Sequence, residues 1–187
     1  MVVRADKDKP SPWAAMGSHD PEVDETRYLE VIRRKTAKLF EASARLGAVL
    51  ARSDPAVETG LADYGVHVGT AFQLIDDVLD YSGDAATIGK SLGDDLAEGK
   101  PTLPLIYAMR CGSAQQAAVV RSAISAGGRE DFGAVLEVIR ATGALEYARA
   151  AAQREAETAA RSIAALPASE SKDCLLELAS FSVTRRS

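Results

Sequence analysis

This 187-residue sequence has few aromatic residues, two cysteines and no long apolar run. Aromatic residues make up 5% of the chain, whereas apolar residues as a class make up 47%, much of it alanine and leucine. Alanine and leucine enter helices at little cost, while strands favour β-branched and aromatic side chains. The composition therefore predicts an all-α protein, with enough residues for one hydrophobic core but few for two.

Other missing features exclude whole classes of function. No apolar run approaches the roughly 20 residues needed to cross a bilayer, and the N-terminal residues lack the apolar segment of a secretory signal, so we expect a cytoplasmic protein without a transmembrane segment. A net charge of −5 argues against a nucleic-acid partner, which favours a clustered basic surface. Cys111 and Cys174 lie far apart and only two histidines are present, which argues against a zinc site or a disulfide framework.

Hydrophobic spacing and breaker residues divide the chain into a loose leader, residues 1–19, and a helical domain, residues 20–187. Residues 82–100 are rich in glycine, aspartate and lysine and have the composition of a functional loop. The expected helices run from about residue 20 to 51, from 55 to about 81, from 101–104 to 111, and then over 114–125, 130–141, 144–165 and 169–183.

The first of these helices has an apolar stripe at Ile32, Leu39, Ser43 and Leu46, which predicts its buried side. Thr36 falls on this stripe and Lys35 at its edge. The pair has an ordinary interpretation, because a lysine can extend its stem along apolar surface and a threonine can bond to its own helix. An inward-leaning lysine would also suit an anionic ligand in a helical cavity.

The second helix carries an acidic cluster in the segment GTAFQLIDDVLDY, residues 69–81. At about 100° per residue, Asp76, Asp77 and Asp80 fall within an arc of about 100° on one side of the helix, and Gln73 joins the same face. Like charges this close destabilise a helix, so a hard cation is expected to offset them. Mg²⁺ is commonly held by one or two carboxylates together with waters and substrate phosphates. The alternative is an acidic face turned to solvent, which the surrounding apolar residues disfavour.

Two further features surround this cluster. Gly65 and Gly69 weaken the same helix relative to alanine, which predicts either close helix packing or a tight approach of substrate. The following loop contains Lys90, Asp95 and Lys100 among glycines. Alone, such a loop would be interpreted as a charged surface, but directly after the cluster we expect its lysines to meet phosphate oxygens.

Together these segments resemble the trans-isoprenyl diphosphate synthases, most closely the bacterial long-chain, octaprenyl-type polyprenyl diphosphate synthases. The matching stretches, which lie within a likeness running from about residue 15 to the C-terminus, are KTAKLFEA at residues 35–42, GTAFQLIDDVLDY at 69–81 and GKSLGDDLAEGKPTLP at 89–104. The resemblance implies a helical array of the isoprenoid synthase type.

The resemblance also implies a function, that of a prenyltransferase of isoprenoid biosynthesis. Such an enzyme adds isopentenyl diphosphate to an allylic diphosphate after Mg²⁺-assisted ionisation. By position in the motifs, the expected metal-binding residues are Asp76, Asp77, Asp80 and Asp95. The expected catalytic and substrate-binding residues are Lys35, Thr36, Gln73 and Lys90, with Lys100 as a further substrate-binding residue. The resemblance also implies a homodimer, the assembly of intact members of the family.

The sequence departs from the family in one respect. Family members carry a first aspartate-rich motif on an earlier helix and an upstream basic segment that binds isopentenyl diphosphate, and neither precedes Lys35 here. We therefore expect the C-terminal part of a synthase, with N-terminal helices missing and little activity alone. Two alternatives stay open: a non-catalytic subunit that needs a complementary chain, and another helical Mg²⁺–diphosphate enzyme such as a terpene cyclase, although GDDLAEGKPTLP is not expected of cyclases.

Overall fold

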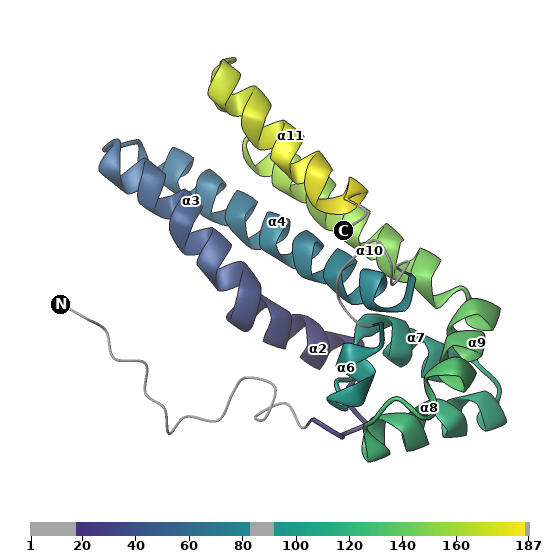
Figure 1. The fold of residues 1–187 in the computed structure, drawn as a ribbon. Coiled ribbons are helices and arrows are strands. Elements are labelled where there is room, and N and C mark those ends of the chain that lie inside the picture. The colour runs from purple at the N-terminus through teal and green to yellow at the C-terminus, as the bar shows by residue number, and fades with distance from the viewer. Residues whose placement is uncertain (1–17, 83–91, 186–187) are drawn as a thin grey trace, which may run out of the picture.

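The computed structural model describes residues 18–82 and 92–185, and within these ranges all regular structure is helical. Figure 1 shows the path of the chain. In order, the helices are α2 (Glu25–Ile32), the π-helical turn η1 (Arg33–Ala37), α3 (Lys38–Leu50), α4 (Pro55–Ser82), α6 (Asp94–Ala97), α7 (Leu103–Cys111), α8 (Ala114–Ala126), α9 (Phe132–Thr142), α10 (Ala144–Ser162) and α11 (Glu170–Thr184). The all-α prediction is confirmed.

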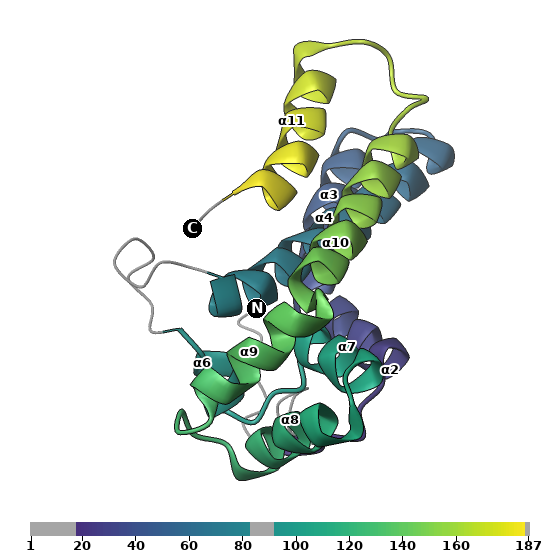
Figure 2. The same cartoon turned by 90° about the vertical axis from the view of Figure 1, so that its right-hand side faces the viewer.

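The long helix α4 lies at the centre of the array, packed between α3 and α10 (Figure 1). The view in Figure 2 shows α11 running back along this layer, while the short helices α6, α7, α8 and α9 gather at the other end. Small and aliphatic side chains fill the main core where α2, α4, α7 and α10 meet; they include Ile32, Leu74, Ile75, Val78, Leu103 and Ala148. This core surrounds the half of α4 that carries the acidic cluster.

Most helix boundaries lie within a few residues of those expected from the sequence. The Asp54 side chain accepts the Ala56 amide at 2.8 Å, so it caps the helix that begins at Pro55. The first helix begins later than expected, at Glu25, because Asp24 takes the capping position and accepts the Arg27 amide. Before it, the His19 amide donates to the Gly99 carbonyl at 2.8 Å. Among the described residues, no helix combines the length and apolarity that crossing a bilayer would require.

The predicted buried stripe of the first helix is right at Ile32 but wrong at Leu39, Ser43 and Leu46. Leu39 and Leu46 are 71% and 55% exposed, whereas the buried positions are Ile32, Ala37 and Ala48. The reason is the turn η1, in which the Lys38 amide donates to the Arg33 carbonyl five residues earlier. This wider turn adds a residue to the helical repeat and shifts every later side chain to a new direction.

Small residues bring α4 close to the first helix. A Cβ built on Gly69 would lie 2.6 Å from the Ala37 Cα, and one built on Gly65 would lie 2.5 Å from the Phe40 carbonyl oxygen. Real Cβ atoms do not approach this closely, so only glycine permits the observed distance between the helices. The sequence left open whether these glycines serve packing or a substrate, and the structure shows close packing.

Candidate functional site

The predicted acidic cluster of α4 separates into three different environments. Asp77 is buried, and its carboxylate accepts two hydrogen bonds, from the Tyr28 hydroxyl at 2.5 Å and from the Gln73 side-chain amide at 2.8 Å. Burial and the charge of Asp95 raise the pKa of Asp77 well above its ordinary value of 3.8, against the opposing effect of both hydrogen bonds. Asp77 is therefore an internal group held by its neighbours.

Thr36 and Gln73 come from helices that are distant in the sequence and meet at this point. The Thr36 hydroxyl donates to the Gln73 Oε1 at 2.8 Å, which joins the turn η1 to the acidic segment of α4. The distance depends on the close approach of these helices at Gly69. The structure thus brings together two of the residues that the sequence assigned to one pocket.

Asp80 binds the backbone that follows the loop. Its two carboxylate oxygens accept the amides of Asp94 and Asp95 at 3.2 and 3.1 Å, and its carbonyl accepts the Gly93 amide. Burial and the negative charge of Asp95 raise the pKa of Asp80 from 3.8 to about 6, although the backbone hydrogen bonds oppose this shift. Asp80 therefore fixes the start of α6 against the end of α4.

Asp95 pairs with Lys100 across the short helix α6. The Lys100 ammonium donates to Asp95 at 2.8 Å and also lies 2.7 Å from a Glu98 carboxylate oxygen. Burial lowers the pKa of Lys100, but these carboxylates outweigh it and raise the pKa above its ordinary value. Both predicted loop residues thus belong to one charged network beside Asp80.

Asp76 is partly exposed, and its neighbour is a residue that the sequence analysis missed. Its side chain is 39% exposed, and its Oδ1 lies 3.5 Å from the Arg185 guanidinium. Arg185 is largely buried: it stacks 3.9 Å from the centre of the Phe72 ring and donates to the Phe72 carbonyl at 2.9 Å. An arginine just after the last helix gives no local sequence signal, because only the fold brings it to α4.

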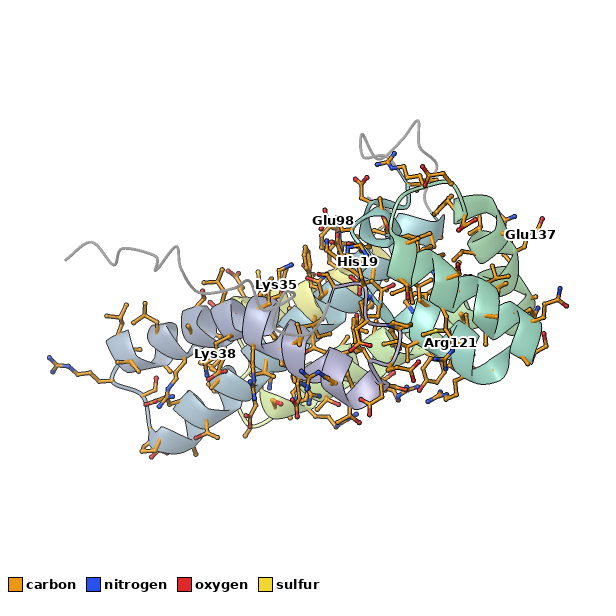
Figure 3. All side chains as sticks on the ribbon, turned by 90° about the horizontal axis from the view of Figure 1, so that it is seen from below. His19, Lys35, Lys38, Glu98, Arg121 and Glu137 are labelled. Carbon is orange, nitrogen blue, oxygen red and sulfur yellow. The ribbon has the colours of Figure 1, made fainter. Side chains whose placement is uncertain are left out.

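Of the two lysines expected to hold the diphosphate, Lys35 and Lys90, the structure describes only Lys35. Lys35 lies in η1 with an exposed side chain, on the edge of the first helix toward His19 and Glu98, whereas Lys38 lies on the opposite edge (Figure 3). Lys90 lies outside the described residues, so the structure does not test its predicted role.

The carboxylates suit Mg²⁺ as a small part of a larger ligand set. Within residues 18–82 and 92–185, no three acidic, histidine or cysteine side chains are grouped closely enough to hold an ion by themselves. Asp76, however, presents an accessible carboxylate, and hard oxygen ligands of this kind are what Mg²⁺ prefers. The fit is to an ion shared with phosphate oxygens, since Mg²⁺ often takes only one or two protein carboxylates.

Comparisons with known proteins agree on the type of protein. The family model described as polyprenyl synthetase matches residues 13–141. The octaprenyl diphosphate synthase of Haemophilus influenzae is 51% identical over 171 residues, covering 91% of this chain and 52% of that protein. The corresponding enzyme of Escherichia coli is 47% identical, covering 91% of this chain and 53% of that protein.

Solved structures give the same result. A polyprenyl synthase from Caulobacter crescentus, crystallised with calcium and isoprenyl diphosphate, matches with a TM-score of 0.86 at 42% identity. The match covers 92% of this chain and 53% of that one. The chain thus has the all-helical fold of these synthases and spans about half the length of the relatives it matches.

Proposed function

Since the chain belongs to the polyprenyl synthetase family, we propose that it is a prenyltransferase polypeptide that binds an allylic diphosphate together with Mg²⁺. The substrates would be that allylic diphosphate and isopentenyl diphosphate, the pair that the resemblance to trans-isoprenyl diphosphate synthases implies. Because the chain matches about half of those enzymes, the proposal for this polypeptide is diphosphate binding, with weak chain elongation on its own.

One observation carries this proposal: the hydrogen bond between Thr36 and Gln73, 2.8 Å long. It joins the first helix, which carries Lys35, to the acidic segment that presents Asp76. A cationic lysine, a polar wall and an accessible carboxylate then lie on neighbouring helices, which is the set of groups that a metal–diphosphate complex requires.

The chemistry proposed is ionisation followed by carbon–carbon bond formation. Departure of pyrophosphate from the allylic substrate leaves an allylic cation, the double bond of isopentenyl diphosphate attacks it, and a proton is lost to the released pyrophosphate. When bound, Mg²⁺ supplies positive charge that offsets the charge building on the leaving group. Lys35 and Lys90 hold the diphosphate, and their fixed charges favour the transition state over the ground state.

Within this proposal the carboxylates have different roles. Asp76 is the direct metal ligand, because its side chain is accessible. Asp77 and Asp80 each already accept two hydrogen bonds to their carboxylate oxygens, so they add charge and keep α4 and the loop in place. Asp95 and Lys100 form a supporting pair next to them, and Lys100 would add positive charge for the diphosphate.

Isothermal titration calorimetry on the full chain tests the binding part of the proposal. Geranyl diphosphate should bind in the presence of Mg²⁺ and should lose most of its affinity when EDTA removes the metal. Equal binding with and without metal, or no binding at all, would contradict the proposal. Incorporation of labelled isopentenyl diphosphate, measured beside an intact synthase, tests elongation separately; turnover equal to that of the intact enzyme would contradict the expectation of weak activity.

A second candidate function is that of a subunit that needs a complementary chain. Its support is the exposed apolar face of α3, on which Leu39, Leu46 and Leu50 are 71%, 55% and 75% exposed. Exposed apolar surface of this kind commonly marks an interaction site. Co-expression with a polypeptide equivalent to the unmatched half of an octaprenyl diphosphate synthase tests this function, because the two chains should then co-purify as a stoichiometric complex. A chain that stays a monomer beside this partner would count against it.

A further inference from the structure

Tyr28 is a buried hydroxyl-bearing residue outside every segment assigned to the site. It lies on α2, is 0% exposed, and sits among the apolar residues of the main core. Its hydroxyl reaches across to α4 and donates to Asp77 Oδ2 at 2.5 Å, a contact between residues 49 positions apart. From the sequence, Tyr28 has the spacing of an ordinary core position.

The hydroxyl of Tyr28 begins a chain of hydrogen bonds with a defined direction. Tyr28 donates to one oxygen of Asp77, and the Gln73 Nε2 donates to the other at 2.8 Å. The Gln73 Oε1 in turn accepts the Thr36 hydroxyl at 2.8 Å. Because an amide has its acceptor at one end and its donors at the other, these contacts fix which way Gln73 points.

This direction matters for anything that binds beside Thr36 and Gln73. The Thr36 hydroxyl proton is committed to Gln73, so Thr36 has no donor left for a phosphate oxygen in this arrangement. Gln73 has two Nε2 hydrogens and gives one to Asp77, which leaves one donor for a phosphate oxygen. Without a donor on its second oxygen, Asp77 would draw on the remaining hydrogen of Gln73 or turn away from it.

We propose that Tyr28 is a positioning residue of the diphosphate site, which holds the Asp77 carboxylate and through it sets the orientation of Gln73 and Thr36. This inference rests on the proposed function, because it gives Tyr28 a role only if a diphosphate binds there. Tyr28 would act through the remaining donor of Gln73, and a hydrogen bond to a charged phosphate oxygen is strong enough that losing its alignment should weaken binding about tenfold.

A second buried tyrosine, which belongs to a different core cluster, separates this role from simple packing. The Tyr64 hydroxyl, on α4, donates to the Leu175 backbone carbonyl at 2.7 Å, and the core cluster around Tyr64 includes no residue assigned to the site. Tyr28→Phe and Tyr64→Phe therefore remove the same atom from two buried tyrosines. Only the first removal leaves an oxygen of the site without its donor.

The experiment measures Mg²⁺-dependent binding of inorganic pyrophosphate to the full chain and both variants by calorimetry, after circular dichroism has confirmed that each variant folds. We expect Tyr28→Phe to weaken pyrophosphate binding about tenfold or more, and Tyr64→Phe to change it by less than about twofold. Equal effects of the two substitutions, or unchanged binding in Tyr28→Phe, would overturn the inference.

A second measurement separates failure of this inference from failure of the proposed function. The side-chain amide protons of Gln73, followed by ¹⁵N NMR without any ligand, should change in shift and exchange more rapidly with solvent in Tyr28→Phe but not in Tyr64→Phe. If the unsubstituted chain does not bind pyrophosphate, the proposed function fails and the site role of Tyr28 fails with it. If pyrophosphate binds but the Gln73 signals are the same in both variants, only the positioning role is overturned.

Discussion

Gly69 of α4 faces Ala37 of η1 so closely that a Cβ on Gly69 would lie 2.6 Å from the Ala37 Cα. The contact is backbone against backbone, so a side chain at residue 69 has no flexible neighbour to displace. Thr36 and Gln73 hydrogen-bond beside this contact at 2.8 Å. The separation of the two helices, and with it the geometry of the candidate site, therefore depends on the absence of one methyl group.

Replacement of Gly69 by alanine should destabilise the fold. The added methyl group has to force the helices apart, and overpacking of this kind costs about 1–3 kcal/mol. Urea denaturation followed by circular dichroism measures this free energy of unfolding. Gly47→Ala is the matched control, because nothing lies within 4 Å of a Cβ at that exposed helical position. The control should be neutral or stabilising by up to about 1 kcal/mol, and an equal loss in both variants would contradict the prediction.

Replacement of Asp76 by asparagine should remove most of the Mg²⁺ dependence of diphosphate binding. The amide keeps the shape of the side chain but not the charge that a hard cation requires. Calorimetric titration with pyrophosphate should show a loss of about tenfold or more in the presence of Mg²⁺. Asp63→Asn, at an exposed position of the same helix, serves as the control and should bind like the unsubstituted chain. The prediction fails if the two variants behave alike.

Replacement of Arg185 by glutamine should strengthen the binding of Mg²⁺ alone. The Arg185 guanidinium lies 3.5 Å from Asp76, so it partly neutralises the carboxylate to which a metal would bind. Partly exposed ion pairs are worth up to about 1 kcal/mol, which corresponds to an increase in affinity of up to about fivefold. A Mg²⁺ titration without diphosphate, followed by NMR, measures the change. Arg185→Lys retains the charge and should change the affinity less; weaker Mg²⁺ binding in Arg185→Gln would speak against competition.

Glu155 should make the stability of the fold sensitive to acid. Burial raises the pKa of Glu155, but the hydrogen bond with His67 at 2.5 Å and the charge of Arg33 outweigh it, so the pKa is lowered from its ordinary value of 4.5. A lowered pKa contributes stability that is present above about pH 4.5 and is lost as the pH falls through the pKa of the folded state.

The matching experiment compares melting temperatures between pH 3 and pH 6. In Glu155→Gln the melting temperature should fall less as the pH is lowered than it does in the unsubstituted chain. The reason is that the substituted chain lacks the contribution of the Glu155 carboxylate at every pH. Glu157→Gln, on the same helix but with an exposed side chain, should keep the acid loss of the unsubstituted chain. Parallel curves for all three proteins would show that the contact between Glu155, His67 and Arg33 contributes nothing.

Substitution of the exposed leucines on α3 should reduce association. Leu39, Leu46 and Leu50 can be changed together to glutamine without opening the core, because each is more than half exposed. Analytical ultracentrifugation at increasing concentration should show a smaller average mass for the triple variant, while circular dichroism stays unchanged. If the variant unfolds instead, these leucines contribute to the fold of the chain itself and the interaction role is wrong.

Much of the fold could be predicted from local sequence signals. The boundaries of α4 followed from Asp54 and Pro55 at one end and the glycine-rich loop at the other, because caps and breakers act within a few residues. Matches of motif and spacing identified the family from the sequence alone. The close approach of the helices at Gly69 was one of two explanations that the sequence allowed for that glycine.

The direction of side chains around the first helix could not be predicted. A stripe spaced at threes and fours assumes one helical repeat throughout, so it cannot detect the wider turn at Arg33–Ala37 that exposes Leu39 and Leu46. For a similar reason the acidic cluster was treated as one surface. The different surroundings of Asp76 and Asp77 arise from Arg185 and Tyr28, which are distant in the sequence and carry no motif.

The wide turn η1 also affects how this part of the chain tolerates changes in length. A helix with a single uniform repeat would accept a substitution at most positions but lose its whole packing face after an insertion or deletion. Here one residue more than the regular repeat is already accommodated between Ile32 and Lys38. A deletion within that stretch would give a more regular helix whose two ends are rotated against each other by about 100°. After such a deletion Tyr28 and Thr36 could no longer reach Asp77 and Gln73 of α4 at the same time.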